Sequence, residues 1–346
     1  MVSELRKKLL TQAKPDARRA VAQLVGTLIP LALIWMLALH LIERSLLLSL
    51  ALTPLAAALM MRVFVFAHDC GHGAFFPSKI ANDICGFWLG VLSLTPYRYW
   101  QHTHNAHHAT SGNLDRRGSG DVTTLTLREY EALPSRQKLA YRIARHPVVM
   151  LGIGPFLLFW IKLRFPWDLP RSYKKEWESI LATNGVLLLA LLLAHISVGI
   201  GSAAMVMVPT LWLAHMMGIF IFYVQHQFEH GYWTRSASWD FEHAARKGST
   251  FLDLPPLLRW ITGSIGYHHL HHLVSRIPNY QLAQLHDQFE SELQPVRIGV
   301  REGISAFRLK LWDEEAAKMI PFPAPLGAST GKIDSQPRNP ERGMSM

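Results

Sequence analysis

Long uncharged stretches constrain the fold of this 346-residue chain more than any other feature of its sequence. A hydrocarbon layer about 30 Å thick needs roughly 20 apolar residues in a helix to cross it. Four stretches meet this need: residues 20–42, 46–67, 180–198 and 203–224. They also explain why only 17% of the residues are charged, against about 25% in soluble domains. The sequence therefore predicts a membrane protein with four helical spans.

Two shorter apolar stretches, residues 84–95 and 148–161, are too short to cross a bilayer as helices. We interpret them as re-entrant or interfacial segments. Basic side chains flank the second stretch on both sides, with Arg142 and Arg145 before it. Those after it are Lys162, Arg164, Arg171, Lys174 and Lys175. Because basic loops are retained on the cytoplasmic side of a membrane, both flanks are expected to lie there.

The predicted fold is an all-α integral membrane protein with four transmembrane helices arranged as two hairpins. The hairpins would turn at residues 43–45 and 199–202, and a helical cap would lie on the cytoplasmic side. Arg44 is then the only one of the 35 lysine and arginine residues on the outer side. Residues 1–321 are expected to form one domain. Residues 322–346 are rich in Gly, Ser, Pro and charge, and are predicted to be a disordered tail.

Histidine is unusually frequent, with 18 residues in the chain. Ten of them fall into four groups: His68 with His72; His104 with His107 and His108; His226 with His230; and His268 with His271 and His272. In a helix, residues three or four positions apart share one face, so each group directs its imidazoles toward one point. In the four-span topology every group lies on the cytoplasmic side or at that membrane edge, where the groups can converge.

Clustered imidazole without thiolate suits iron, copper, nickel or zinc. The chain has only two cysteines, Cys70 and Cys85, which excludes a disulfide framework and a thiolate zinc cluster. A single zinc ion uses three or four protein ligands, far fewer than the ten histidines of the four groups. We therefore expect two metal ions, and open coordination positions favour O2 chemistry at iron.

The remaining histidines are given other interpretations. Those within the predicted spans are expected to form hydrogen bonds between helices: His40, His195 and His215. Three more are interpreted as surface or interface residues: His146, His243 and His286. His102 and His269 adjoin the four groups and are secondary ligand candidates. Asp69 and Glu229 are nearby carboxylates that could orient a metal ligand.

Three of the motifs occur in a characteristic order: HDCGH at 68–72, HNAHH at 104–108 and HHLHH at 268–272. They resemble the three histidine boxes of membrane-bound fatty acid desaturases. Two further segments, GNLDRRGSGD at 112–121 and YVQHQFE at 223–229, are similar to bacterial acyl-lipid desaturases of the Δ12 (omega-6) type. The resemblance covers roughly residues 20–300 of the chain.

The resemblance implies a di-iron centre held by the eight box histidines: His68, His72, His104, His107, His108, His268, His271 and His272. The family supplies one further histidine between the fourth span and the last box, where this chain offers His226 or His230. Similar proteins often have HQFED at this place, whereas this chain has HQFEH. The implied reaction uses O2 and two electrons to convert adjacent methylenes of a lipid acyl chain into a cis double bond, expected at the Δ12/omega-6 position.

The electrons are expected to come from a separate carrier. The chain has no haem-binding His-Pro-Gly-Gly segment, no Gly-rich dinucleotide motif and too few cysteines for an iron–sulfur cluster. Family analogy favours ferredoxin, and Arg116, Arg117 and Arg246 are interpreted as basic docking residues for an acidic carrier. No nucleic-acid partner is expected, because the net charge of +10 is attributed to a cytoplasmic face. The resemblance also implies location in a bacterial inner membrane.

Two alternatives remain open at this point. A hydroxylase or ketolase acting on alkanes, lipids or carotenoids would use the same scaffold and differs in keeping oxygen in its product. A histidine-rich metal transporter belongs to another class. Transport predicts polar ligands near the middle of the bilayer, whereas these histidine groups are expected at its cytoplasmic edge.

Overall fold

Four apolar helical spans dominate the computed structural model, which describes residues 3–118 and 120–323. They are α2 (Ala17–Ile42), α3 with α4 (Leu46–Ala51 and Thr53–Gly71), α10 (Lys174–Ser197) and α11 (Ile200–His226). Each is long and apolar enough to cross a membrane when α3 and α4 are counted together. This confirms the four predicted apolar helices. Helix α10 begins earlier than predicted, because the polar residues from Lys174 onward continue the same helix.

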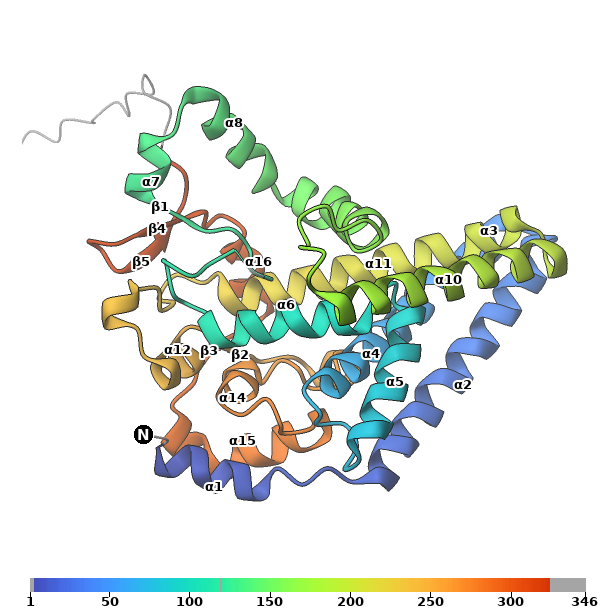
Figure 1. Ribbon diagram of the computed structural model, residues 1–346, viewed down its shortest axis with the longest axis horizontal. Coiled ribbons are helices and arrows are strands. Elements are labelled where there is room, and N and C mark those ends of the chain that lie inside the picture. Colours follow the sequence, from blue (N-terminus) through green and yellow to red (C-terminus); the bar gives the residue numbers. More distant parts are fainter. Residues whose placement is uncertain (1–2, 119, 324–346) are drawn as a thin grey trace, which may run out of the picture.

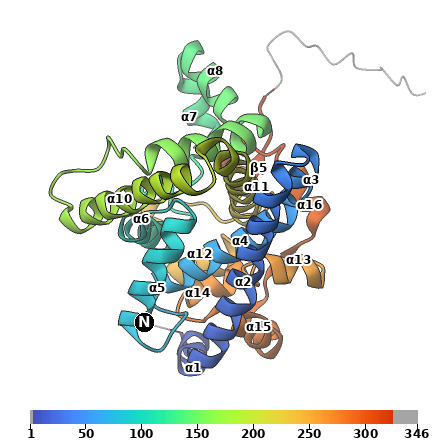
Figure 2. The same ribbon diagram turned by 90° about the vertical axis from the view of Figure 1, so that its right-hand side faces the viewer.

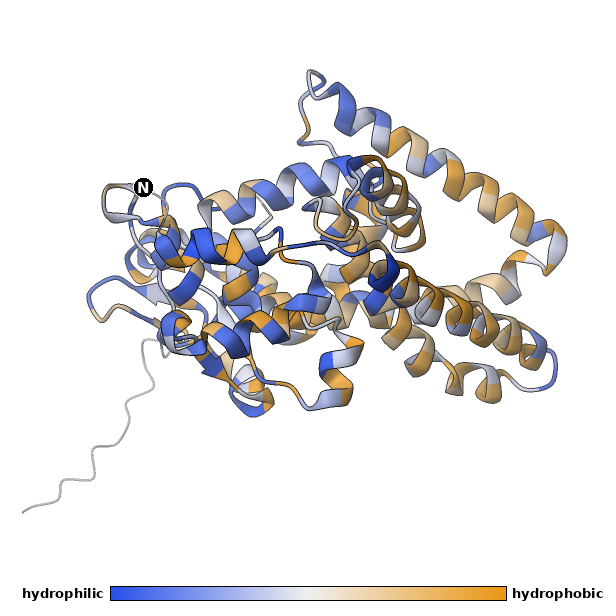
Figure 3. Cartoon of the chain, turned by 90° about the horizontal axis from the view of Figure 1, so that it is seen from below, coloured by the Kyte–Doolittle hydropathy of each residue, from blue (hydrophilic) through white to orange (hydrophobic). Residues whose placement is uncertain are grey.

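The four spans form two hairpins whose turns lie at the same end of the molecule, on the right of Figure 1. One turn, Glu43–Ser45, joins α2 to α3, and the other is the short connection between α10 and α11. In the second turn Gly199 has a φ of 79°, which glycine adopts without the steric cost of a side chain. Figure 3 shows that the hairpin end is hydrophobic, whereas the opposite end mixes polar and apolar residues.

Helix α4 is the centre of the packing and lies between α2, α5 (Lys79–Leu92) and α11 (Figure 2). Its residues from Ala56 onward are buried almost without interruption up to Gly71. The outer helices, by contrast, expose large apolar side chains: Leu33 of α2 is 56% exposed and Leu188 of α10 is 59% exposed. This burial pattern is that of a helical protein whose outer surface faces lipid.

The predicted segment 148–161 has an irregular backbone. Two π-helical runs, η1 (Val149–Ile153) and η2 (Leu157–Lys162), flank the three-residue α9 (Gly154–Phe156). The preceding α8 (Ser135–Ala144) is bent away from this segment by 63°. By length and composition, α8 and the segment together match a broken span or a re-entrant loop. The other predicted short segment largely coincides with the second half of α5.

The remaining elements form a cap beside the hairpins, on the left of Figure 1. Its helices are α1 (Glu4–Gln12), α6 (Tyr97–Thr110), α7 (Leu127–Ala132), η3 (Ser236–Ser238), α12 (Phe241–Lys247), α13 (Pro256–Ile261), α14 (His268–Leu273), α15 (Asn279–Leu293) and α16 (Val300–Ala306). The chain is mostly helical, as predicted, and the cap is where it departs from an all-α fold.

Five short strands lie in this cap and were not predicted. They are β1 (Leu125–Thr126), β2 (Thr250–Leu252), β3 (Val296–Ile298), β4 (Leu311–Asp313) and β5 (Lys318–Ile320). Strand β4 pairs with β1 in parallel and with β5 in antiparallel orientation, while β2 and β3 form a separate parallel pair. Strands of two or three residues are too short to produce an alternating sequence pattern.

Most of the predicted C-terminal tail, residues 324–346, lies outside the described residues. The described part ends with Phe322 and Pro323. Phe322 packs against Tyr130 and Tyr141, and the guanidinium of Arg142 lies over its ring. The chain therefore contacts the cap at least as far as this aromatic cluster.

Candidate metal centre

Nine of the ten predicted ligand histidines converge in two groups. Cluster A consists of His68, His72, His104, His108 and His271, and cluster B of His107, His226, His268 and His272. Within each cluster, one ring nitrogen of every member lies within 4.8 Å of those of the others. Histidines separated by some 200 residues in the sequence therefore meet at one place, as the sequence analysis expected.

Helix geometry explains how the motifs divide between the clusters. His68 near the end of α4 and His72 just after it lie one turn apart and both belong to cluster A. Helix α6 gives His104 and His108 to cluster A but His107 to cluster B, because His107 lies on a neighbouring face. Helix α14 likewise divides its histidines, with His271 in cluster A and His268 and His272 in cluster B. Two helices thus supply ligands to both clusters.

The ring nitrogens face one another at short distances. In cluster B, Nε2 of His226 lies 2.9 Å from Nε2 of His268 and 3.2 Å from Nε2 of His107. In cluster A, Nε2 of His108 lies 3.1 Å from Nε2 of His104 and 3.1 Å from Nε2 of His271. A neutral imidazole carries only one N–H, so hydrogen bonds cannot satisfy such a set of converging nitrogens. Metal cations would be coordinated by these lone pairs, and the donor sets therefore fit metal sites.

The two clusters adjoin each other, since the rings of His108 and His272 stack with centroids 4.1 Å apart and planes 10° apart. Burial, and secondarily the neighbouring histidines, hold the pKa values of His104, His108, His271 and His272 well below the ordinary value. These imidazoles are therefore neutral at physiological pH, which is the form that binds metal ions.

Two carboxylates orient ligand histidines. Nδ1 of His107 donates to Asp121, and Nδ1 of His68 lies 3.2 Å from Oδ1 of Asp69. The backbone N–H of Asn279 donates to the other oxygen of Asp69 at 2.7 Å. A hydrogen bond from Nδ1 to a carboxylate leaves Nε2 free to bind a metal ion.

Asp69 was predicted to act in this way, whereas Glu229, the other predicted carboxylate, is exposed and its side chain lies near Lys318. Asp121 was missed as a histidine partner. Its sequence signal is its position at the end of the segment GNLDRRGSGD at 112–121, which resembles the family but contains no histidine.

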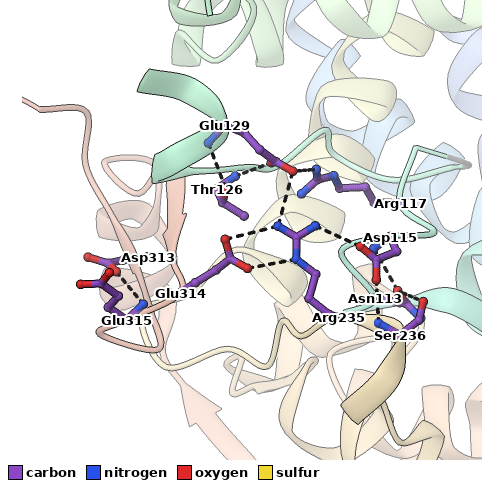
Figure 4. Close-up of polar contacts among 10 residues, drawn as sticks. All are labelled: Asn113, Asp115, Arg117, Thr126, Glu129, Arg235, Ser236, Asp313, Glu314 and Glu315. Carbon is purple, nitrogen blue, oxygen red and sulfur yellow. Dashed lines mark hydrogen bonds and ion pairs between the residues drawn. The ribbon is translucent and has the colours of Figure 1, made fainter. Parts of the chain in front are cut away.

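Figure 4 shows an ion-pair network that includes Asp115 and Arg117, which lie on the same loop as Asp121. At its centre, Arg235 donates to Glu314 at 3.0 and 3.3 Å and to Asp115 at 3.0 Å. Arg117 pairs with Glu129, whose second oxygen accepts from a backbone N–H at the start of α7. The network joins the loop after α6, the segment after α11 and the turn between β4 and β5.

The other predicted candidates lie outside the clusters. His230 is exposed just beyond the end of α11. His102 is exposed and its Nδ1 lies 3.4 Å from Glu176. His269 is buried, but its Nε2 faces Nδ1 of His286 at 3.3 Å instead of either cluster. Contrary to the surface interpretation, His286 is only 2% exposed.

An apolar cavity of about 400 Å³ extends from the histidines along α4 and α11. His68, His104 and His268 line it, and so do Met60 of α4 and His215 of α11. From His226 to His215, α11 advances about 16 Å along its axis. Nε2 of His215 donates to the carbonyl of Ser93 at 3.1 Å, the kind of bond between elements that was expected of an intramembrane histidine.

The fatty acid desaturase family model matches residues 45–303, which is most of the chain. The chain belongs to the fatty acid desaturase family. This desaturase is 40% identical over 321 residues to a fatty acid desaturase of Bacillus subtilis, an alignment that covers 93% of this chain and 91% of the relative. Membership in the family makes it an oxidoreductase and disfavours the transporter hypothesis.

Plant relatives align with a smaller share of this chain. A probable fatty acid desaturase of Sorghum bicolor is 32% identical over 64% of this desaturase and 58% of the relative. A chloroplast sn-2 acyl-lipid omega-3 desaturase (ferredoxin) of Arabidopsis thaliana is 29% identical over 64% of this desaturase and 50% of the relative. The alignments with these two plant proteins thus span between half and three fifths of their length.

Proposed function

We propose that this desaturase is a di-iron enzyme that introduces a cis double bond into the acyl chain of a membrane lipid. The observation that carries this proposal is the contact between the histidine clusters and the apolar cavity. His68 and His104 of cluster A and His268 of cluster B line that cavity. A hydrocarbon chain inside it would therefore lie directly against the metal-binding groups.

We assign the iron ligands as the nine clustered histidines: His68, His72, His104, His107, His108, His226, His268, His271 and His272. His226 is chosen over His230 because its Nε2 lies beside those of His107 and His268. When bound, two iron ions with O2 would supply the oxidising power that unactivated methylene groups require.

The side chains of the cavity would bind and orient the acyl chain. Phe64, Val65, Ile221 and Phe222 line it close to the histidines and provide an apolar surface that excludes water. Trp100 stacks on His104, with centroids 4.3 Å apart, and fixes the orientation of that ring. The head group of the lipid would remain at the polar loop of Asp121, and the methyl end would extend toward His215.

The membrane orientation follows from the distribution of charge. Arg44 alone among the lysine and arginine residues lies in the two hairpin turns, whereas the histidine end of the molecule is rich in basic residues. By the positive-inside rule, the cap and the metal centre would face the cytoplasm of a bacterial inner membrane. The folded domain would extend at least to Phe322, one residue past the boundary predicted at 321, because Phe322 packs against Tyr130 and Tyr141.

The proposed electron donor is a separate acidic carrier of the ferredoxin class. Arg116 is exposed and could contact such a carrier. Arg117 and Arg246 have intramolecular partners, Arg117 in the ion pair with Glu129 and Arg246 with the carbonyls of Glu292 and Leu293. The name of the chloroplast relative of Arabidopsis thaliana specifies ferredoxin. The name of an endoplasmic reticulum acyl-lipid omega-3 desaturase of the same plant, 28% identical to this chain, specifies cytochrome b5, so reduction assays should compare both carriers.

The proposed product has its double bond at the Δ12/omega-6 position, although the chloroplast relative of Arabidopsis thaliana is named an omega-3 desaturase. The test is lipid profiling after expression in a host that lacks polyunsaturated fatty acids. We expect a dienoic acyl chain whose second double bond is Δ12. An omega-3 product would change only the proposed position of the double bond and would leave the desaturase proposal in place. A hydroxylated or keto product that retains oxygen would replace the desaturase proposal with the hydroxylase or ketolase alternative.

A further inference from the structure

The irregular segment Val149–Lys162 separates two apolar spaces. On one side Leu158 and Phe159 line the cavity that contacts the histidine clusters. On the other side Leu151, Gly152 and Phe156 line a groove of about 810 Å³ on the outside of the molecule. The segment is therefore a single layer of chain between the reaction cavity and the surroundings of the protein.

The groove lies at a depth where hydrocarbon surrounds the protein. Its other wall is formed by Val208, Trp212 and Met216 of α11, in the middle part of a 27-residue apolar helix. All of its lining residues are apolar, and on its rim Val148 is 65% exposed and Ile153 is 51% exposed. Lipid acyl chains are the abundant molecules at this depth of a bilayer. An acyl chain is therefore the occupant that fits the groove.

Two of the contacts between α11 and the segment lie on its two sides. Nε1 of Trp212 donates to the carbonyl of Gly152 at 2.9 Å on the groove side. On the cavity side, His215 stacks on Phe159 with centroids 3.9 Å apart and planes 7° apart. Trp212 and His215 are three residues apart and so lie near each other on α11. Movement of the segment would also separate Phe159 from the buried cluster that it forms with Tyr99, Leu163 and Ile180.

The backbone of the segment suits a moving part. Both η1 and η2 are π-helical, a rare form that occurs mostly as single turns and often at functional sites. Gly152 has no atom close to the position that a side chain would occupy, so the chain there is not tightly packed. The segment is also joined to α8 at a 63° bend, which separates it from the regular helix before it.

We propose that Val149–Lys162 is a lateral gate through which the acyl chain of a bilayer lipid passes from the groove into the reaction cavity. The chain enters sideways when Phe159 leaves His215 and the segment moves away from α11. This proposal rests on the proposed function as an acyl-lipid desaturase. It explains why an apolar groove open to lipid and an apolar cavity at the metal centre share one thin wall.

The test joins the two sides of the groove. Gly152→Cys and Val208→Cys are introduced together with Cys85→Ser, which removes the more accessible native thiol. A reducible thiol cross-linker then ties the segment to α11 in proteoliposomes. We expect desaturation of phospholipid to fall at least tenfold on cross-linking and to return on reduction. Full activity in the cross-linked protein would overturn the gate.

The matched control cross-links Ile196→Cys of α10 to Ile200→Cys of α11, exposed positions at the hairpin turn, so that it restrains α11 without touching the segment 149–162. This link should leave activity unchanged. Equal loss of activity in both cross-linked proteins would mean that any restraint on α11 inhibits the enzyme, which would also overturn the gate.

A second readout does not depend on turnover. A phospholipid with a photoreactive diazirine in its acyl chain is expected to label the cavity residues Gly218, Ile219, Ile221 and Phe222, and cross-linking across the groove should abolish this labelling. Unchanged cavity labelling would overturn the gate even if no double bond is formed. If cross-linking abolishes the cavity labelling but no double bond is formed even without the cross-link, the result would instead count against the proposed function alone. Cross-linking between two copies through Gly152→Cys would identify a second chain, and not lipid, as the occupant of the groove.

Discussion

Asp121 illustrates how much a single side chain controls in this desaturase. Its carboxylate accepts a hydrogen bond from Nδ1 of His107 and thereby directs Nε2 of that ring toward His226. The ion pairs of Arg235 hold the loop on which Asp121 lies. The orientation of one ring in cluster B therefore depends on a chain of contacts that reaches the surface of the cap.

Asp121→Ala should weaken iron binding and activity about 10- to 100-fold, because the ring of His107 loses the partner that fixes its tautomer. Asp121→Asn should retain more activity, since the amide oxygen still accepts the hydrogen bond. Iron content by elemental analysis and initial rates of desaturation measure the effect. The exposed Asp287→Asn is the control. Wild-type iron content and rate in Asp121→Ala would remove Asp121 from the metal centre.

His226→Ala should lower activity by about 100-fold or more and release part of the bound iron, because the variant lacks a nitrogen that lies in the centre of cluster B. His230→Ala should keep near wild-type activity and iron content, since that side chain is exposed outside both clusters. The two variants differ in position by four residues and are each other's control. If His230→Ala lost activity and iron while His226→Ala kept both, His230 and not His226 would be the ligand.

The sequence predicted the box histidines because spacings of three and four residues define a helix face. It left His226 and His230 undecided, since the choice depends on where α11 ends: His226 is its last residue and His230 lies past it. Asp121 could not be paired with His107 for a similar reason. Their contact is made by a loop whose path is set by ion pairs between distant segments, and no local pattern encodes such a path.

At the scale of helices, small residues determine how closely the elements around the metal centre approach. A side chain at Gly86 of α5 would lie 2.3 Å from the ring of Tyr97. The hydroxyl of Tyr97 donates to the carbonyl of Cys70 at 2.8 Å, next to the histidines at the end of α4. The close contact between α5 and the start of α6 therefore supports the backbone of the first histidine box.

Gly86→Ala should destabilise the protein by about 1–3 kcal/mol, because the added methyl group overlaps the Tyr97 ring and must displace it. Gly185→Ala in α10 is the control, since a side chain there meets no other atom within 4 Å. Thermal unfolding in detergent measures the stability of both variants. If Gly86→Ala were as stable as Gly185→Ala, Tyr97 would not be a fixed support of the box.

Elements differ in how well the sequence indicates them. The spans were predictable because about 20 apolar residues in a row have few other stable arrangements. The short strands and the π-helical runs were not, since each depends on a neighbour: β1 on β4, η1 on α11, and η2 on the stack of Phe159 against His215 of α11. Tertiary contacts determine these structures, and the contacts form between residues far apart in the chain.

At the scale of the whole molecule, the orientation in the membrane can be measured directly. Cysteines introduced at Ser172 and Ala237 are both exposed on the histidine side of the spans and should react only with reagents that reach the cytoplasm. A cysteine at Arg44, in the opposite turn, should react from outside. Both positions follow the segment 149–162 and are separated from each other only by the two spans α10 and α11. Labelling of both Ser172→Cys and Ala237→Cys from outside, as for the cysteine at Arg44, would therefore mean that the segment 149–162 crosses the membrane.

The purified desaturase should contain about two iron ions per chain, because two adjacent clusters of four and five histidines each fit one ion. Elemental analysis with colorimetric iron determination checks this number, and chelation should remove activity and iron together. An active preparation with one zinc ion and no iron would contradict the di-iron proposal.

The division of α6 and α14 between both clusters has a consequence for how the protein is made. A ribosome synthesises α4 and α6 long before α14, so His268, His271 and His272 arrive after most of the membrane hairpins are in place. Until then cluster B holds only His107 and His226, and cluster A lacks His271. Neither site is complete in an unfinished chain. A truncated product that ends before residue 268 would therefore be anchored in the membrane without a finished oxidising centre.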